Sequence, residues 1–362
     1  MSAAVEYRPA SAVLEITNRC NLRCPHCASN SGRPRRYEMS VPELFKVIEE
    51  LRELGCERLT MLGGEPLLHP QWFEIGRHVN DCGIVLQIIT NSLAMDKTVL
   101  RKFRELDPEV IGISIDGATR ESYLATRGVD KFESCLKNLW SIRDSGIPAA
   151  AITTFSRRNL YDFDRFVEIF ADRGIIWQIQ MANSTGSRFD DDMKLTARDF
   201  EFFVDRAIKV KKELANRLPL QLTDDFGYFP YERWVPEFDL WEGCPAGRRV
   251  IGIRSNGDVL PCLSLGDGFV AGNLLRETLR EVWDNSRLMR TFRNKCEVLA
   301  GRCKTCPRAA RCQAGCTASA VTTTGNIGEN LYCIRRMEED KIVEDFSSSD
   351  EETAAEIRPD GT

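Results

Sequence analysis

Short apolar runs alternate with amphipathic stretches through the first half of the chain. Between these runs, apolar residues recur with helical spacing, as in SVPELFKVIEELRELG, where Ser40 suits the N-cap and Gly55 the C-terminal stop. Strands separated by helices predict a parallel sheet, and nearly continuous apolar strands predict that both of its faces are covered. An open sheet and a barrel satisfy this alternation equally. The six predicted strands, short and rich in Ile, Val and Leu, span residues 12–17, 58–64, 83–91, 110–117, 149–155 and 175–182.

The second half of the chain has a different pattern. Residues 197–218 predict one more long helix, and the aromatic segment 224–241 follows it. This segment either faces a substrate or packs the two halves of the protein together. The chain then becomes rich in turns and cysteine. Asn256 and Gly257, the favoured pair for a tight turn, predict a hairpin, and residues 277–295 have a helical pattern.

Composition narrows the class of protein. The 49 Lys and Arg residues are outnumbered by 54 Asp and Glu, and the net charge of -5 provides no basic footprint for nucleic acid. No apolar run is long enough to cross a bilayer, and the N-terminal MSAAVEYRPA lacks the basic and apolar regions of a signal peptide. We therefore expect a cytoplasmic protein with no membrane partner. Thiols stay reduced there, so the 14 cysteines are expected to be metal ligands, catalytic groups or small core residues.

Most cysteines lie near the two ends of the chain. Three isolated ones, Cys56, Cys82 and Cys135, are expected to pack in the core. Just after the first predicted strand, NRCNLRCPHCASN carries three more in a CxxxCxxC pattern. Structural zinc sites use four ligands, usually as two close pairs. A four-iron cluster held by only three cysteines instead leaves one iron open to a substrate or cofactor. The three are Cys20, Cys24 and Cys27; His26 between the last two is either part of this site or a surface histidine.

These motifs resemble those of the radical S-adenosylmethionine (SAM) enzymes. The match comprises CNLRCPHC after the first strand, GGEPLL (63–68) after the second, ITNS (89–92) at the third and GISIDG (112–117) at the fourth. Each lies at the C-terminal end of a strand, where ligand sites of parallel α/β folds gather. The resemblance implies an α/β fold, a partial (βα)6 TIM-like barrel. It also implies a [4Fe–4S] cluster whose open iron chelates SAM and which cleaves SAM to a 5′-deoxyadenosyl radical.

The same resemblance implies residues that bind SAM. Gly63 and Gly64 would let the backbone approach the methionyl group, and Glu65 would accept a hydrogen bond from its ammonium. Asp116 would contact ribose or carboxylate, or else be an ordinary turn aspartate before a glycine. Arg127 would bind the SAM carboxylate or be a surface arginine. The complete set of candidates is Gly63, Gly64, Glu65, Pro66, Asn91, Ser114, Asp116 and Arg127.

The C-terminal cysteines resemble the SPASM extension of radical SAM proteins, which typically holds two auxiliary [4Fe–4S] clusters. The resemblance implies a proximal cluster on Cys244, Cys262 and Cys316 and a distal cluster on Cys303, Cys306, Cys312 and Cys333. No cysteine lies between residues 135 and 244, so the proximal cluster would have an open iron or an unusual ligand. Cys296 lies outside the pattern and is expected to be a packed or exposed thiol rather than the missing ligand.

The expected function is radical oxidation of an unactivated C–H bond, most simply the maturation of a peptide by crosslink or thioether formation. Oxidation or rearrangement of a small molecule, such as an antibiotic sugar or a tetrapyrrole precursor, is the alternative; a zinc-binding interaction protein is the competitor from another class. Leu263 stands where sulfatase maturases carry an acidic base, which argues against that activity. The residues name no catalytic acid or base.

Partners and domains follow from the same interpretation. We expect a flavodoxin- or ferredoxin-type reductant and a peptide or small-molecule substrate. With 19 residues before Cys20 we expect no fused peptide-binding domain, so a peptide would need a separate recognition protein or direct docking. The expected domains are a radical SAM barrel (1–218), an aromatic linker (219–243), a SPASM domain (244–344) and a disordered acidic tail (345–362).

Overall fold

Ten strands of the computed structural model, which describes residues 7–223 and 243–340, form one sheet in the order β10-β9-β8-β1-β2-β3-β4-β5-β6-β7. Strands β1 to β7 pair in chain order and run parallel, as the alternation predicts. All six predicted strands are present, and β7 is an additional strand within the expected linker. The bounds are β1 (Ser11–Glu15), β2 (Arg58–Leu62), β3 (Val85–Thr90), β4 (Val110–Ser114), β5 (Ala149–Phe155), β6 (Ile176–Met181) and β7 (Leu220–Leu222).

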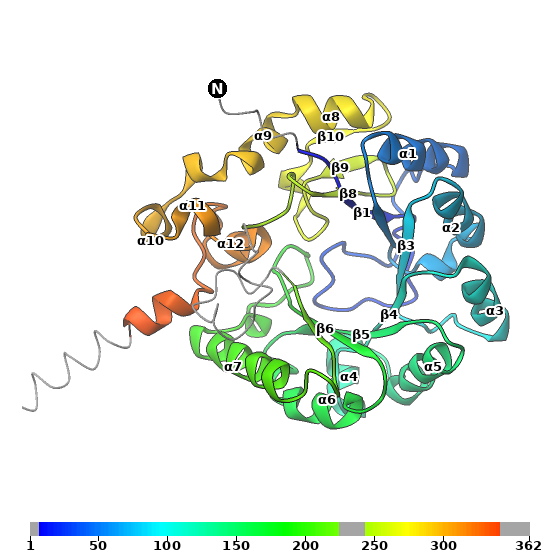
Figure 1. The fold of residues 1–362 in the computed structure, drawn as a ribbon, viewed down its shortest axis with the longest axis horizontal. Helices are drawn as coiled ribbons and strands as arrows, with labels where there is room; N and C mark the ends of the chain where they lie inside the picture. Colours follow the sequence, from blue (N-terminus) through cyan, green and yellow to red (C-terminus); the bar gives the residue numbers. More distant parts are fainter. Residues whose placement is uncertain (1–6, 224–242, 341–362) are drawn as a thin grey trace, which may run out of the picture.

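Helices cover the outer side of this curved sheet, so the strands and helices together form a partial barrel (Figure 1). The helix α4 was not predicted; it carries Arg127 as its last residue. The helices are α1 (Val41–Glu53), α2 (Trp72–Asp81), α3 (Lys97–Leu106), α4 (Arg120–Arg127), α5 (Phe132–Asp144), α6 (Phe163–Phe170) and α7 (Ala197–Glu213), with short 3-10 turns η1 (Pro66–Leu68), η2 (Leu160–Asp162) and η3 (Asp191–Met193). Within the described ranges no helix is both long and apolar enough to span a bilayer.

Helix α1 shows how the sequence produces these elements. Ser40 occupies the N-cap, and its backbone N–H donates to the Glu43 carboxylate at 2.7 Å, which satisfies a donor that the first turn leaves free. Gly55 follows the helix with φ of +83°, a conformation that glycine adopts without strain. The buried face repeats with helical spacing, and each such side chain contributes about 1.5–3 kcal/mol by leaving water. This face consists of Leu44, Val47, Ile48 and Leu51.

An aromatic cluster fixes the later strands against their helices. Phe155 of β5 lies 5.3 Å from Phe163 of α6 and 4.9 Å from Phe203 of α7, measured between ring centroids. Trp177 of β6 lies 5.0 Å from Phe163 in the same way. All four rings are buried. Large aromatic side chains dominate core energetics, so this cluster anchors one half of the barrel.

The C-terminal region continues the barrel sheet. Strand β8 (Val250–Ile253) pairs in parallel with β1, and it forms the predicted hairpin with β9 (Asp258–Leu260) around Gly257, where φ is +84°. Strand β10 (Gly272–Asn273) ends the sheet. The predicted 277–295 helix is two helices, α8 and α9, because the chain turns at Ser286 between them. Their bounds and those of the remaining elements are α8 (Leu279–Asn285), α9 (Arg287–Arg293), α10 (Gly301–Lys304), α11 (Ala309–Cys312), α12 (Thr317–Thr324), η7 (Asp267–Phe269) and η8 (Lys295–Val298).

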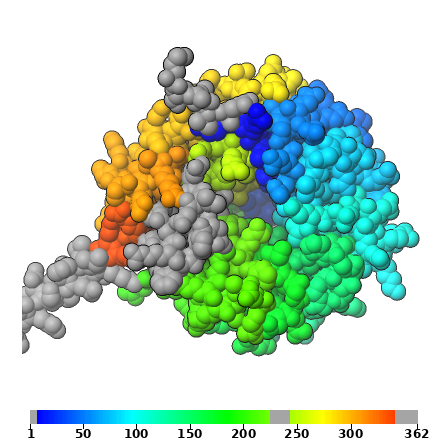
Figure 2. All heavy atoms as spheres, viewed as in Figure 1, coloured from blue at the N-terminus to red at the C-terminus, as the bar shows by residue number. Residues whose placement is uncertain are grey.

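Buried polar contacts also connect the C-terminal region to the barrel. The Arg35 guanidinium donates to both oxygens of buried Glu15 on β1, at 2.7 and 2.9 Å. In the hairpin turn, the Ser255 hydroxyl lies 2.8 Å from a Glu15 oxygen and 3.1 Å from a Glu38 oxygen, so the two carboxylates share its single O–H. The C-terminal region is therefore joined to β1 by main-chain pairing and by the bond to Glu15, and to the segment after β1 by the bond to Glu38. Figure 2 shows these C-terminal segments, yellow to orange, beside the blue-to-green barrel.

The three isolated cysteines differ from one another. Cys56 and Cys135 are buried, as predicted. Cys82, at the end of α2, is only partly buried but packs against the same core. The aromatic segment 224–241 and the acidic tail after residue 345 lie outside the described residues, and the expectations for them stay predictions.

Candidate metal and cofactor centres

Four of the sequence motifs meet at one cavity of about 150 Å³. The cavity lies where the loops after β1, β2, β3 and β4 converge, at the C-terminal edge of the parallel sheet. The lining includes the three thiols of the CxxxCxxC loop and five of the eight predicted SAM-binding residues. These lining residues are Cys20, Cys24, Cys27, Gly63, Gly64, Asn91, Ser114 and Arg127. Glu65, Pro66 and Asp116 are not among the residues that line it.

The cysteine loop is shaped by main-chain hydrogen bonds. Cys20 N–H donates to the Gly32 carbonyl at 3.2 Å, which closes the base of the loop. Backbone N–H groups also point at the sulfurs: Leu22 N–H lies 3.4 Å from Cys20 Sγ, and Ser31 N–H lies 3.4 Å from Cys27 Sγ. Such contacts stabilise negative charge on cluster-bound thiolates, so the loop fits an iron–sulfur cluster.

Burial favours the protonated form of the Cys20 and Cys24 thiols in the metal-free chain. It raises the pKa of Cys20 to about 11 and also raises the pKa of Cys24, although Arg127 opposes the second shift. Thiolate is the form that binds metal, so loading the site releases protons. Within residues 7–223 and 243–340, no three His, Cys, Asp or Glu side chains converge closely enough to hold one metal ion. A cube of four irons spreads its ligands over separate corners, which suits thiols arranged around a cavity.

The two glycines of GGE are required by close contact between two loops. A Cβ on Gly63 would lie 2.4 Å from the Thr17 carbonyl oxygen, and a Cβ on Gly64 would lie 2.4 Å from the Arg19 carbonyl oxygen. Gly64 N–H donates to that Thr17 carbonyl at 2.7 Å. The sequence predicts that the backbone at these glycines approaches a cofactor. The structure shows that it also approaches the backbone at the start of the cysteine loop.

Glu65 ties the ends of β2 and β3 together. Its fully buried carboxylate accepts from Thr90 Oγ1 at 2.6 Å, Asn91 N–H at 2.7 Å and Leu67 N–H at 3.2 Å. Burial raises the pKa of Glu65 to about 7 even though these three donors oppose the shift. The carboxylate thus positions Asn91 at the cavity, a role that the sequence did not indicate.

Asp116 is the centre of a buried ion-pair group. Its carboxylate lies 2.6 Å from Arg127 Nε and 3.0 Å from His26 Nε2, and it accepts from Thr154 N–H at 2.7 Å. Burial alone would raise the pKa of Asp116, but Arg127 and His26 hold it below its usual value. Arg127 also donates to Cys24 Sγ at 3.6 Å. Asp116 is therefore more than a turn residue, and neither Arg127 nor His26 lies on the surface.

Arg188, which was not predicted as a site residue, holds the cysteine loop in place by hydrogen bonds. It follows β6, lines the same cavity, and donates to the carbonyls of Cys24 at 3.2 Å and Ser31 at 3.1 Å. Nearby, a Cβ on Gly186 would lie 2.2 Å from the Cys27 carbonyl oxygen. No spacing or motif marks this segment, because its role depends on contact with residues more than 150 positions away.

The proximal set of C-terminal cysteines lines a second cavity, of about 180 Å³. Cys244, Cys262 and Cys316 face it. Cys296 does not; its exposed thiol lies 3.8 Å from the Ala310 carbonyl oxygen. This location agrees with the expectation that Cys296 is not the missing ligand.

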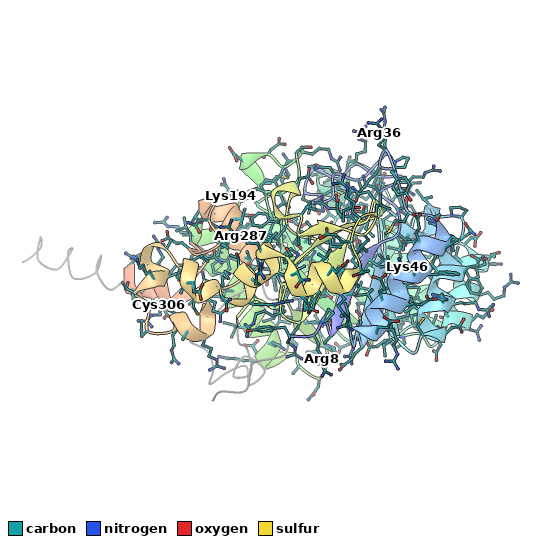
Figure 3. All side chains as sticks on the ribbon, turned by 90° about the horizontal axis from the view of Figure 1, so that it is seen from above. Arg8, Arg36, Lys46, Lys194, Arg287 and Cys306 are labelled. Carbon is teal, nitrogen blue, oxygen red and sulfur yellow. The ribbon has the colours of Figure 1, made fainter. Side chains whose placement is uncertain are left out.

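A third cavity, of about 330 Å³, contains part of the distal set. Cys303, Cys306 and Cys333 line it, together with three arginines, Arg302, Arg335 and Arg336. Cys312, at the end of α11, is not among its lining residues. Figure 3 shows Cys306 toward the left end of the molecule, on the other side of Arg287 from Lys46 of α1.

Known proteins resemble both parts of the chain. Residues 14–170 match the model of the radical SAM superfamily, and residues 244–307 match the SPASM iron–sulfur cluster-binding domain. The AdoMet-dependent heme synthase of Methanosarcina barkeri is 30% identical over 351 residues, covering 92% of this chain and 98% of that protein. The mycofactocin maturase MftC of Mycobacterium tuberculosis is 29% identical over 322 residues, covering 87% and 80%.

Solved structures share the fold. Streptococcus suis SuiB bound to S-adenosylmethionine superposes with a TM-score of 0.73 at 17% identity, covering 90% of this chain and 76% of that one. SuiB bound to its precursor peptide SuiA gives 0.73 at 16% identity, with 90% and 75% coverage.

Proposed function

Because the chain belongs to the radical SAM superfamily and carries a SPASM domain, we propose that it is an oxidative maturase that modifies a peptide at an unactivated C–H bond. The chain is an enzyme, and its cofactors are SAM and [4Fe–4S] clusters. When bound at the barrel, cluster and SAM supply the 5′-deoxyadenosyl radical that abstracts hydrogen. The family matches argue against the competing interpretation of a zinc-binding interaction protein.

One observation carries the proposal: three separate cavities are each lined by three cysteines. We assign the SAM-binding cluster to Cys20, Cys24 and Cys27, the proximal auxiliary cluster to Cys244, Cys262 and Cys316, and the distal one to Cys303, Cys306, Cys312 and Cys333. The barrel cavity also has Arg127 and Ser114 as donors for a carboxylate or ribose. Two further cluster sites suit an oxidation, since the substrate radical must give up an electron.

A peptide substrate is supported by two kinds of relative. MftC is a maturase, and SuiB was solved with a precursor peptide. A tetrapyrrole precursor is the second candidate, because the match to the heme synthase extends over nearly the whole of that protein. For a peptide we further propose recognition by a separate protein or direct docking. Reduction by a flavodoxin- or ferredoxin-type carrier, in the cytoplasm, completes the proposal.

Anaerobic turnover decides between the two substrates. The reconstituted enzyme is incubated with SAM, a reductant and either a short peptide encoded beside its gene or an iron porphyrin bearing propionates. Substrate deuterated at the reacting carbon should transfer deuterium to 5′-deoxyadenosine, and mass spectrometry should show loss of two hydrogens from the peptide. Deuterium transfer from the porphyrin alone would replace the peptide assignment with the second candidate.

Cluster assignment is tested separately from the substrate. Replacing Cys20, Cys24 and Cys27 together by Ala should abolish 5′-deoxyadenosine production and lower the iron content from about twelve to about eight per chain, because thiolate ligation is local to each cluster. Unchanged 5′-deoxyadenosine production would refute the assignment of the barrel cluster.

A further inference from the structure

Lys295 is a buried cation in the C-terminal region. It begins η8, and only 2% of its surface is exposed. Its Nζ donates to the Gly315 carbonyl at 3.1 Å and to Thr317 Oγ1 at 2.9 Å, the residues on either side of Cys316. An ammonium has three N–H groups, and the described residues provide acceptors for two. Burying a lysine in this way is costly unless opposite charge is close by.

No carboxylate within residues 7–223 and 243–340 forms an ion pair with Lys295, so thiolates are its nearest source of opposite charge. Burial lowers the pKa of Lys295, whereas four thiolates oppose that shift because they favour the charged form. They are Cys244 and Cys316 of the proximal set and Cys312 and Cys303 of the distal set. The ammonium therefore lies beside Cys316 of the proximal set, held by the residues on either side of that cysteine.

We propose that Lys295 is a counter-charge of the proximal auxiliary cluster and that it raises the reduction potential of that cluster. Each electron that enters a cluster adds negative charge, and a fixed cation nearby stabilises that reduced form more than the oxidised one. The effect is strong here because the ammonium itself is buried away from water. The inference rests on the proposed cluster assignment.

The proposed role fits the electron balance of the reaction. A substrate radical that becomes a closed-shell product loses one electron and one proton. The electron enters an auxiliary cluster and later leaves to a one-electron carrier of the flavodoxin or ferredoxin class, and the proton goes to water. A higher auxiliary potential favours this transfer over return of the electron to the substrate radical.

The test is a redox titration of the anaerobically reconstituted full-length protein, followed by electron paramagnetic resonance. Auxiliary signals are those that persist when the three barrel cysteines are replaced by Ala. Lys295→Met removes the charge at similar length, Lys295→Arg keeps it, and Lys304→Met removes an exposed lysine beside Cys303 as the matched control.

At a fixed solution potential, Lys295→Met should lower the ratio of reduced to oxidised auxiliary cluster at least about tenfold, which equals about 59 mV for a one-electron couple. In Lys295→Arg and Lys304→Met this ratio should stay within about twofold of the wild-type ratio. Lys295→Arg keeps the charge, and water screens the charge that Lys304→Met removes. A wild-type titration curve for Lys295→Met, or an equal shift for Lys304→Met, would overturn the proposal.

Iron content and visible absorption are measured before each titration. Wild-type protein without auxiliary clusters would refute the proposed cluster assignment, whereas intact clusters with unchanged potentials would refute only the role of Lys295. If Lys295→Met fails to load iron, Lys295→Gln is titrated instead. Both neutral variants could lose auxiliary iron while Lys295→Arg keeps it. The positive charge would then be needed to assemble the cluster, and its proposed role in setting the reduction potential would be overturned.

Discussion

Replacing Asp116 by Asn removes the charge at the centre of the buried group beside the cluster loop. The Asp116 side chain is 0% exposed and that of Arg127 11%, and their atoms approach to 2.6 Å. Asparagine has nearly the same shape, so the change isolates charge from packing. Arg127 cannot release its proton, and it would remain buried without its counter-ion.

The expected loss is large because the pair is buried. Removing one partner of a buried ion pair costs about 3–5 kcal/mol of folding free energy, since the other charge is left desolvated and uncompensated. Helix α4 offers a matched control: Arg120 at its start pairs with Asp130, and both of those side chains are exposed. Exposed pairs contribute little, so Asp130→Asn should leave stability unchanged within error.

Urea unfolding of the metal-free chain, followed by circular dichroism, measures both variants at pH 7. The pKa of Asp116 is depressed in the folded state, so its stabilisation is present above the ordinary aspartate pKa, about 3.9, and is lost as the pH falls through the folded-state value. The difference between wild type and Asp116→Asn should therefore shrink on acidification. A loss at pH 7 no larger than that of Asp130→Asn would refute this account of the site.

Three further predictions concern glycine, cysteine and glutamate positions. Gly64→Ala should cost about 1–3 kcal/mol and impair barrel-cluster loading, because its Cβ would meet backbone carbonyls at 2.4 and 2.5 Å; Gly268→Ala, with nothing within 4 Å, should match wild type in iron content and urea midpoint. Cys296→Ala should keep all iron and Cys316→Ala should lose about four irons, and a Cys296 variant that loses iron would mean that the proximal cluster is fully ligated by cysteine. Burial raises the pKa of Glu65 to about 7, above its unfolded value, so wild type should lose about 3 kcal/mol of stability relative to Glu65→Gln as the pH rises from about 5 to 8; equal pH profiles would contradict this.

Much of the fold could be predicted from local signals. The strands from β1 to β6 were found because apolar runs and helical spacing are properties of neighbouring residues, as are N-caps and Gly stops. The hairpin at Asn256 and Gly257 was found for the same reason, since its turn conformation depends on those two residues. The CxxxCxxC spacing likewise predicted one cluster site, because its three proposed ligands come from one short loop.

Local patterns could not show which distant segment contacts each element. That β8 pairs with β1, about 240 residues earlier, depends on main-chain groups that every sequence offers, so only packing selects the partner. The contact of Asp116 with His26 and the burial of Lys295 beside Cys316 arise in the same way. Each needs polar groups from separate segments to be buried together, and that burial exists only once the tertiary structure has formed.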